Sequence, residues 1–219
     1  MPNYCMNKLE LSGKQQDIAE LLAFVKSEES SFDFNKIKPI PQSIKNTERG
    51  SVAFASEAVC WYLKEKKITN HLKWLFDRYN ISEDELAEKV EQWQKENKVD
   101  LNLGYRIIEN RQRYQGYGDW YEWCIANWGT KWEACDPEIQ NNVIVFETAW
   151  SPATPIIERL AQLFPQIDFI YKYFEPGFNL AGRNTYLQGN CVTCDSYDYN
   201  EEAYVRIGNE FGFEFTDDN

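Results

Sequence analysis

The sequence predicts an α+β fold: a ferredoxin-like βαββαβ antiparallel sheet with a helical insertion and an extra C-terminal hairpin. Three observations predict it. Apolar and polar residues alternate along the N-terminal segment, amphipathic helical patterns separate strand-like segments, and the order of the regular segments is strand, helix, strand, strand, helix, strand. The chain of 219 residues, 43% of them hydrophobic, is long enough to bury a core without a disulfide scaffold.

The core begins with a strand and a helix. At residues 5–12 the odd positions are mostly apolar and the even positions mostly polar, as in a strand with one buried face, and Gly13 ends it. Apolar residues then recur at helical spacing over residues 18–25. Residues 32–41 are expected to be extended, because each proline there disfavours helix in the residue before it.

Residues 56–115 have a helical pattern throughout. A helix is expected at residues 56–65, a second after Asn70 as its cap, a third after the capping box Ser82–Glu85, and a fourth over residues 105–113. A block of about 60 residues is small for an independent domain, so we interpret it as an insertion.

The second half supplies a hairpin. Asp119 is expected to cap a short helix. Residues 131–136 and 143–150 are expected to pair as strands around the turn Asn141–Asn142. The hairpin provides the two adjacent strands of the predicted core.

The C-terminal part completes the sheet. Thr154 is expected to cap a helix that has proline at its first position, and residues 167–174 form the next strand. Residues 184–187 and 192–199 predict the extra hairpin, whereas the acidic residues 201–219 receive no assignment.

These elements give one predicted domain, residues 1–219. Within it, residues 1–45 and 116–182 form the ferredoxin-like core, residues 56–115 the helical insertion and residues 183–219 a C-terminal extension.

The charge is acidic and unevenly placed. Residues 1–110 hold 16 Lys and Arg against 18 Asp and Glu, a net charge of −2, whereas residues 111–219 hold 7 against 17, a net charge of −10. Such a surface disfavours nucleic acid and membranes as partners and favours a basic protein. The sequence shows no secretory signal and no apolar run long enough for a membrane span, so we predict a cytoplasmic protein with reduced thiols.

Catalytic signatures are weak. His71, the only histidine, lies in the insertion and is expected to be exposed and not catalytic. Cys191 and Cys194 form the only CxxC, with no second pair to complete a zinc site. The acidic pairs match no calcium loop, and no phosphate-binding glycine motif occurs. We therefore predict no metal and no cofactor, and favour a protein that is not an enzyme.

A tryptophan-rich block after Gly116 carries the candidate binding site. Five tryptophans fall within 31 residues, and they either pack the core or line a pocket with nearby polar groups. The sequence leaves both interpretations open. The candidate residues are Trp120, Trp123, Asn127, Trp128, Thr130, Lys131, Trp132, Trp150 and Glu175.

Several segments resemble the YubB ferredoxin-like domain family. They are residues 1–9, 121–132, 148–152, 164–169 and 173–177. The resemblance covers the frame of strands and helices but not the insertion. It implies a ferredoxin-like fold and a bacterial, plasmid or phage origin, and it supplies no catalytic residues.

Three functions follow as hypotheses. The preferred one is a non-catalytic, acidic binding protein that engages a host macromolecule, in one version by imitating nucleic acid on a basic site. The alternative is a small-molecule-binding protein or enzyme with its site at the tryptophan-rich block. The third, nucleic-acid binding by the sheet, lacks the basic signature of RNA-recognition domains.

Overall fold

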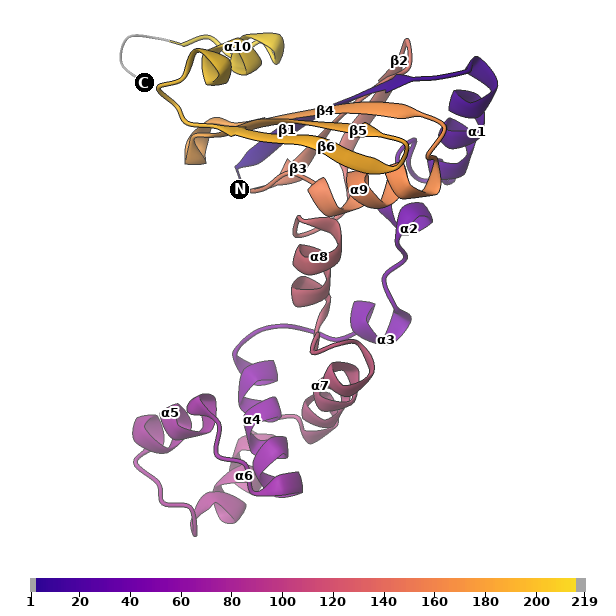
Figure 1. Ribbon diagram of the computed structural model, residues 1–219. Coiled ribbons are helices and arrows are strands. Elements are labelled where there is room, and N and C mark those ends of the chain that lie inside the picture. Colours follow the sequence, from indigo (N-terminus) through magenta and orange to yellow (C-terminus); the bar gives the residue numbers. More distant parts are fainter. Residues whose placement is uncertain (1–2, 216–219) are drawn as a thin grey trace. The chain divides into compact units, whose positions relative to one another are not determined.

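The computed structural model describes residues 3–215, and the chain divides into two compact units (Figure 1). The sheet unit comprises Met1–Pro39 and Cys124–Asn219, and the helical unit comprises Ile40–Trp123. The segment predicted as a helical insertion, residues 56–115, lies within the helical unit. That it is an insertion into a single domain stays a prediction.

The described part of the sheet unit contains one six-stranded antiparallel sheet. Its strands are β1 (Tyr4–Ser12), β2 (Cys135–Gln140), β3 (Val143–Ala149), β4 (Asp168–Glu175), β5 (Leu180–Leu187) and β6 (Asn190–Tyr197). The spatial order is β2-β3-β1-β4-β5-β6, with every neighbouring pair antiparallel. The first four strands form the predicted ferredoxin-like core, and β5 and β6 extend it beyond β4. The predicted fold class is therefore confirmed.

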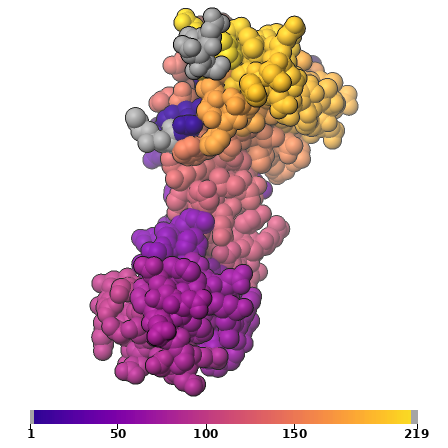
Figure 2. Space-filling model, turned by 90° about the vertical axis from the view of Figure 1, so that its left-hand side faces the viewer, coloured from indigo at the N-terminus to yellow at the C-terminus, as the bar shows by residue number. Residues whose placement is uncertain are grey.

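Helices cover both faces of this sheet. The helices α1 (Gln15–Val25) and α9 (Thr154–Leu163) lie on one face, and α10 (Glu202–Glu210) lies on the other (Figure 1). Alternate residues of β1 and β4 fill the first interface, which explains the period-two pattern. On the second face Phe174 and Ala181 pack against Tyr204 and Ile207 of α10. Figure 2 shows this yellow C-terminal segment on the surface of the sheet unit.

Three local predictions in the sheet unit are wrong. Residues 32–41 are not extended throughout, because the Asp33 carboxylate accepts the Asn35 N–H at 2.8 Å and starts the single turn α2 (Phe34–Ile37). The first hairpin strand is β2, not residues 131–136: pairing with β3 begins at Cys135 and continues to Gln140, with a bulge between Cys135 and Glu138. The N-cap of α9 is Ala153, and Thr154 is already helical.

The hairpin turn itself is confirmed. Gln140 pairs with Val143, so Asn141 and Asn142 form a two-residue turn. Both asparagines have positive φ angles, 51° and 64°. Asparagine tolerates this conformation better than most residues, which is why the pair is a strong hairpin signal.

The thiol prediction needs a correction at one pair. Cys191 and Cys194, on β6, are joined by a disulfide, whereas Cys5, Cys60, Cys124 and Cys135 are free. Residues three apart in a regular strand point to opposite faces. Here the register with β5 shifts by one residue at Val192, and this bulge brings both sulfur atoms to the same side.

The helical unit contains α3 to α7 and the start of α8. These helices are α3 (Gln42–Lys45), α4 (Ser51–Glu65), α5 (Asn70–Tyr79), α6 (Leu86–Lys95), α7 (Leu101–Arg113) and α8 (Trp120–Trp128). Its largest fully buried side chain is Trp93, which packs in a core formed mainly by α4, α5 and α6.

Helix caps in this unit refine the predictions. Asn70 is not the cap of α5, because the Thr69 hydroxyl accepts the Leu72 N–H at 3.1 Å. The Ser82 N–H does bond to the Glu85 carboxylate, at 2.7 Å, as in the predicted box, but α6 starts only at Leu86. Asp119 caps α8 as expected, accepting the Glu122 N–H at 3.0 Å.

Candidate functional site

Four residues of the predicted set are buried, and three of them lie in or just after α8. Trp123 and Trp128 are 5% and 3% exposed, and Thr130 is fully buried. The Trp128 indole N–H donates to the Lys38 carbonyl at 2.9 Å, and the Thr130 hydroxyl donates to the Ala149 carbonyl at 3.0 Å. The hydrogen bonds of Trp128 and Thr130 fix the segment after α8 within the sheet unit, which is a packing role.

Four further candidates are half-buried: Trp120, Asn127, Lys131 and Trp132. The Trp120 ring meets the edge of Tyr121. The Lys131 ammonium lies 4.8 Å from the centre of the Trp132 ring. Trp120 and Trp123 belong to the helical unit and the other seven candidates to the sheet unit, so the predicted set is divided between two units.

The last two candidates, Trp150 and Glu175, lie at the same end of the sheet, and both contact the turn that contains Phe178. Trp150 directly follows β3, is 41% exposed and has a φ of 71°. Its ring centre lies 5.6 Å from that of Phe178, which is 60% exposed. Phe178 belongs to the short helix η1 (Pro176–Phe178). The buried Glu175 carboxylate fixes this turn by accepting the N–H groups of Gly177 and Phe178 at 3.0 and 2.6 Å.

A pocket of about 420 Å³ adjoins the same turn. Aromatic rings from the segment after β6 form much of its lining. Tyr204 lies 5.8 Å and Phe213 lies 4.9 Å from Phe215, measured between ring centres. The lining residues are Pro176, Gly177, Asn179, Tyr199, Tyr204, Phe213 and Phe215.

Strand register explains why these aromatic residues gather. Tyr4 pairs with Ala149, next to Trp150, and Ala181, just after η1, pairs with Tyr197. The start of β1 and the ends of β3, β4 and β6 therefore lie at the same end of the sheet. We call the exposed and pocket-lining set there the aromatic end: Tyr4, Trp150, Phe178, Tyr199, Tyr204, Phe213 and Phe215.

The charges on and around the aromatic end favour the binding of a cationic group. The sheet unit holds 10 Lys and Arg against 21 Asp and Glu, a net charge of −11, whereas the helical unit holds 13 against 14, a net charge of −1. Asp198, Glu201 and Glu214 are exposed and stand next to or near pocket residues in the chain. Burial and then the charge of Glu175 raise the pKa of Tyr204 above its usual value. The residues that line the pocket include no lysine or arginine.

Sequence reasoning identified two residues near this site and missed most of the others. Tyr4, Phe178 and Tyr199 stand in segments without a recognisable motif. The alternation Phe211-Gly-Phe213-Glu-Phe215 was the available signal, because aromatic residues at every second position indicate one apolar face.

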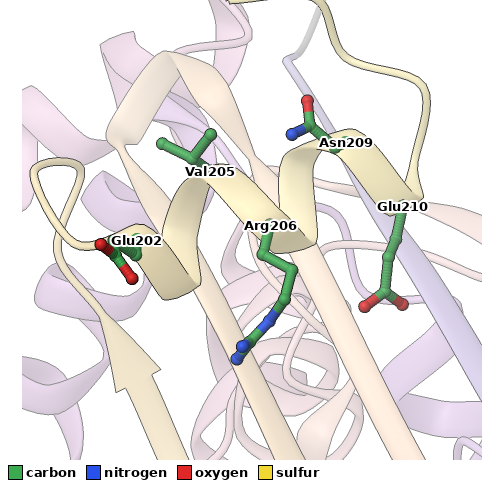
Figure 3. A pocket seen from close by; sticks show the side chains of 5 residues that line it. All are labelled: Glu202, Val205, Arg206, Asn209 and Glu210. Atoms are coloured by element: carbon green, nitrogen blue, oxygen red, sulfur yellow. The ribbon is translucent and has the colours of Figure 1, made fainter.

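Another pocket, of about 570 Å³, lies along the exposed side of α10 (Figure 3). Glu202, Arg206 and Glu210 follow one another at a spacing of four residues, which stabilises a surface helix. Lys172 of β4 lies 2.5 Å from Glu210 and 3.4 Å from Glu10. On this face of the sheet Lys172 is thus paired with carboxylates.

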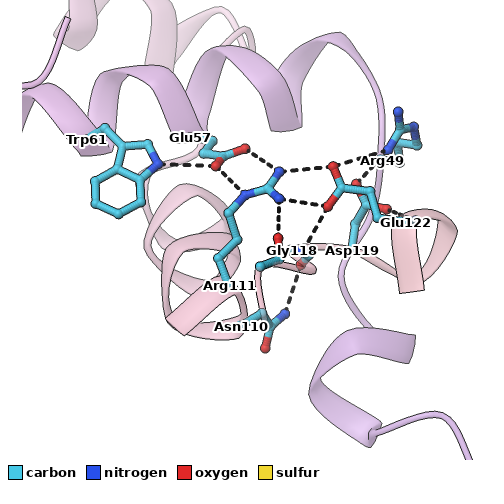
Figure 4. Close-up of polar contacts among 9 residues, drawn as sticks. Arg49, Glu57, Trp61, Asn110, Arg111, Gly118, Asp119 and Glu122 are labelled. Carbon is cyan, nitrogen blue, oxygen red and sulfur yellow. Dashed lines mark hydrogen bonds and ion pairs between the residues drawn. The ribbon is translucent and has the colours of Figure 1, made fainter. Parts of the chain in front are cut away.

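The helical unit has its own polar cluster, centred on Arg111 (Figure 4). The guanidinium contacts both carboxylate oxygens of Glu57, at 2.5 and 3.0 Å, and both of Glu122, at 2.8 and 3.0 Å. Arg49 joins it through Asp119 at 3.0 Å. These contacts join α4, α7 and the start of α8.

The remaining residues that the sequence analysis considered for catalysis or metal binding have the following surroundings. His71 is exposed and its ring lies between those of Phe54 and Trp74, at 5.4 and 5.5 Å. Over residues 3–215, no three His, Cys, Asp or Glu side chains are grouped so that they could hold a metal ion. Within the same described residues, none of the helices has the length and apolar character needed to cross a bilayer.

The match to a known domain lies in the part of the chain that carries this site. Residues 127–215 match the model of the ferredoxin-like domain in Api92-like proteins. The crystal structure of a protein api92 from Yersinia pseudotuberculosis is similar at 14% sequence identity and a TM-score of 0.46, over 92% of this chain and 99% of that one. No curated protein matches the sequence. The matched domain is ferredoxin-like, as predicted, but it is the Api92-like domain and not specifically a YubB family.

Proposed function

We propose that this protein is a non-catalytic binding protein that engages a basic protein partner through the aromatic end of its sheet unit. The observation that carries the proposal is the exposed pair Trp150 and Phe178, held on a unit with a net charge of −11. Aromatic rings are enriched in protein interfaces, and their faces attract the cationic side chains of a basic partner.

The backbone of Trp150 supports this use. Its φ of 71° lies in the left-handed region, which costs a bulky residue about 1–3 kcal/mol. A large ring that is 41% exposed recovers less of that cost by burial than a core residue would. Such strain is common where a side chain is positioned for a ligand.

The acidic surface would guide the encounter. A net negative charge raises the association rate of a basic protein, and this effect weakens as salt increases. A host macromolecule in the cytoplasm of a bacterium carrying a plasmid or phage is the proposed source of the partner. That part of the proposal rests on the resemblance to the YubB family.

The test uses the full chain and a fluorescently labelled octalysine peptide, with octaglutamate as the charge control, read by anisotropy. The double variant Trp150→Asn/Phe178→Ser keeps the net charge and is expected to weaken octalysine binding at least tenfold. The variant Trp74→Ser removes a ring that is 49% exposed in the helical unit and is expected to bind like the wild type. Equal binding by all three proteins would show that the attraction is only general charge and would contradict the proposal.

A further inference from the structure

The pocket beside η1 has the composition of a receptor for one cationic side chain. Four aromatic residues contribute to its lining: Tyr199, Tyr204, Phe213 and Phe215. Tyr204 is 3% exposed, so it is fixed by packing, whereas Tyr199 is 65% exposed and stands at the surface. The volume, about 420 Å³, lies within the usual range of ligand pockets and is large enough for a whole side chain.

The rings are held in place from behind. Phe174 of β4 lies 5.0 Å from Tyr204 and 5.2 Å from Phe213, measured between ring centres. Gly208 of α10 leaves room for Phe215, because a Cβ at this position would lie 2.6 Å from the Phe215 ring. The cluster is therefore a supported wall rather than a group of loose side chains.

The polar groups of the pocket fit a guanidinium better than a primary ammonium. An ammonium is strongly hydrated and needs three hydrogen-bond acceptors, whereas a guanidinium is weakly hydrated, planar and stacks on aromatic faces. Among the lining residues, Asn179, Tyr199 and Tyr204 carry polar groups in their side chains. The buried carboxylate of Glu175 adds a fixed negative charge behind the turn.

We infer that this pocket binds a single arginine side chain of the partner, stacked on the rings of Tyr199, Tyr204, Phe213 and Phe215. The inference rests on the proposed function, which it deepens by naming the group that is recognised. The charge of the sheet unit, −11, is the complement that an arginine-bearing partner requires.

The experiment is a calorimetric titration of the full chain with Nα-acetyl-arginine N-methylamide. The matched control is the citrulline analogue, which has the same shape but no charge. The arginine compound is expected to bind at least tenfold more tightly than the citrulline compound and the corresponding lysine compound. Equal binding of the arginine and citrulline compounds would make this a neutral apolar pocket, and tighter binding of lysine would remove the preference for guanidinium; either result overturns the inference, as does no binding of the arginine compound.

Three variants locate the effect. Tyr199→Ser removes an exposed ring and is expected to lower the affinity for the arginine compound at least fivefold, whereas Tyr199→Phe keeps the ring and is expected to retain most of the affinity. Tyr105→Ser, a change at a residue 38% exposed in the helical unit, is expected to leave the affinity unchanged. Unchanged affinity in Tyr199→Ser contradicts the inference.

The two experiments distinguish failure of the arginine pocket from failure of the proposed function. If octalysine binding depends on Trp150 and Phe178 but the arginine compound does not bind, the partner surface stands and the arginine pocket fails. If the arginine compound binds and octalysine binding ignores those two rings, the pocket stands and the proposed partner surface fails.

Discussion

The two units place charge differently. In the sheet unit a neutral network joins β1, β3 and β4: the Asn7 side-chain amide donates to Thr148 Oγ1 at 2.8 Å and accepts the Tyr171 hydroxyl at 2.5 Å, and all three residues are fully buried. The helical unit instead joins its helices through Arg111 and two carboxylates.

The net charges of the two units differ in the opposite sense. The helical unit has a net charge of −1, whereas the sheet unit has a net charge of −11. Charged groups join the helices of the helical unit, and under the proposed function the negative charge of the sheet unit serves recognition. The predictions that follow test this division, from the largest expected effect to the smallest.

Replacing Arg111 by Met should have the largest effect on stability. It would leave Glu57 and Glu122 without their shared cation while both are mostly shielded from water, at 15% and 27% side-chain exposure. We expect the helical unit to lose about 2–4 kcal/mol of unfolding free energy. Denaturant unfolding measures this, with the exposed Arg113→Leu as the control in the same helix. A loss no larger than in the control would show that the cluster contributes nothing to stability.

Replacing Asn7 by Leu should destabilise the sheet unit somewhat less. The change leaves the Tyr171 hydroxyl without its acceptor in a buried site, although that oxygen still accepts the Ala153 N–H at 2.9 Å. The expected loss is about 1–3 kcal/mol, and it should not depend on salt because no formal charge is involved. Denaturant unfolding at two salt concentrations tests this, with Asn209→Leu on exposed α10 as the control. A strong salt dependence would show that the effect of the substitution involves charged groups and would contradict a neutral network at Asn7.

Acid should weaken the helical unit through Glu122. Burial acts to raise the pKa of Glu122, but hydrogen bonds from Arg111 and the Gly118 N–H, and the charges of Arg111 and Arg49, outweigh it and hold the pKa below the usual 4.5. The unfolded chain therefore binds protons more readily, so this stabilisation is complete above about pH 5 and is lost as pH falls through the folded pKa.

Hydrogen exchange of the backbone amides of α4 and α7 between pH 6 and pH 3.5 measures this loss. After correction for intrinsic exchange, protection in these helices should fall in wild-type protein. It should fall less in Arg111→Met, in which Glu122 has lost its main partner. The same fall in both proteins would assign the acid sensitivity to other groups.

Replacing Trp150 by Asn should change stability least. Asparagine accepts the left-handed backbone, so relief of strain offsets the lost contact with Phe178, and we expect a net change within about 1 kcal/mol. Thermal unfolding checks it. A loss of stability as large as that from replacing a core tryptophan would mean that Trp150 is a packing residue. The recognition surface of the sheet unit would then have to lie elsewhere.

Local patterns predicted most of the fold. The alternation in β1 and the turn Asn141–Asn142 each depend on neighbours in sequence, and both are correct. The helix α10 was missed, although Tyr204, Ile207 and Phe211 have helical spacing, because the acidic composition around them obscured it. The single turn α2 depends on one capping side chain, Asp33, which proline-based reasoning overlooks.

The candidate site was predictable only in part. Trp150 and Glu175 were among the predicted residues, but they were assigned to a site around the tryptophans of α8. Their actual neighbours come from the register of strands distant in sequence, since Tyr4 pairs with Ala149 and Ala181 with Tyr197. Register between distant strands is set by the packed core as a whole, and no local motif encodes it.

The most direct test of the division between the units is a two-dimensional ¹H–¹⁵N spectrum of the full chain titrated with octalysine. The eight tryptophan indole N–H groups are reporters, with Trp128, Trp132 and Trp150 in the sheet unit and the other five in the helical unit. The account predicts that the Trp150 signal moves most and that the exposed Trp74 signal stays in place. Movement of Trp74 with Trp150 unchanged would contradict it.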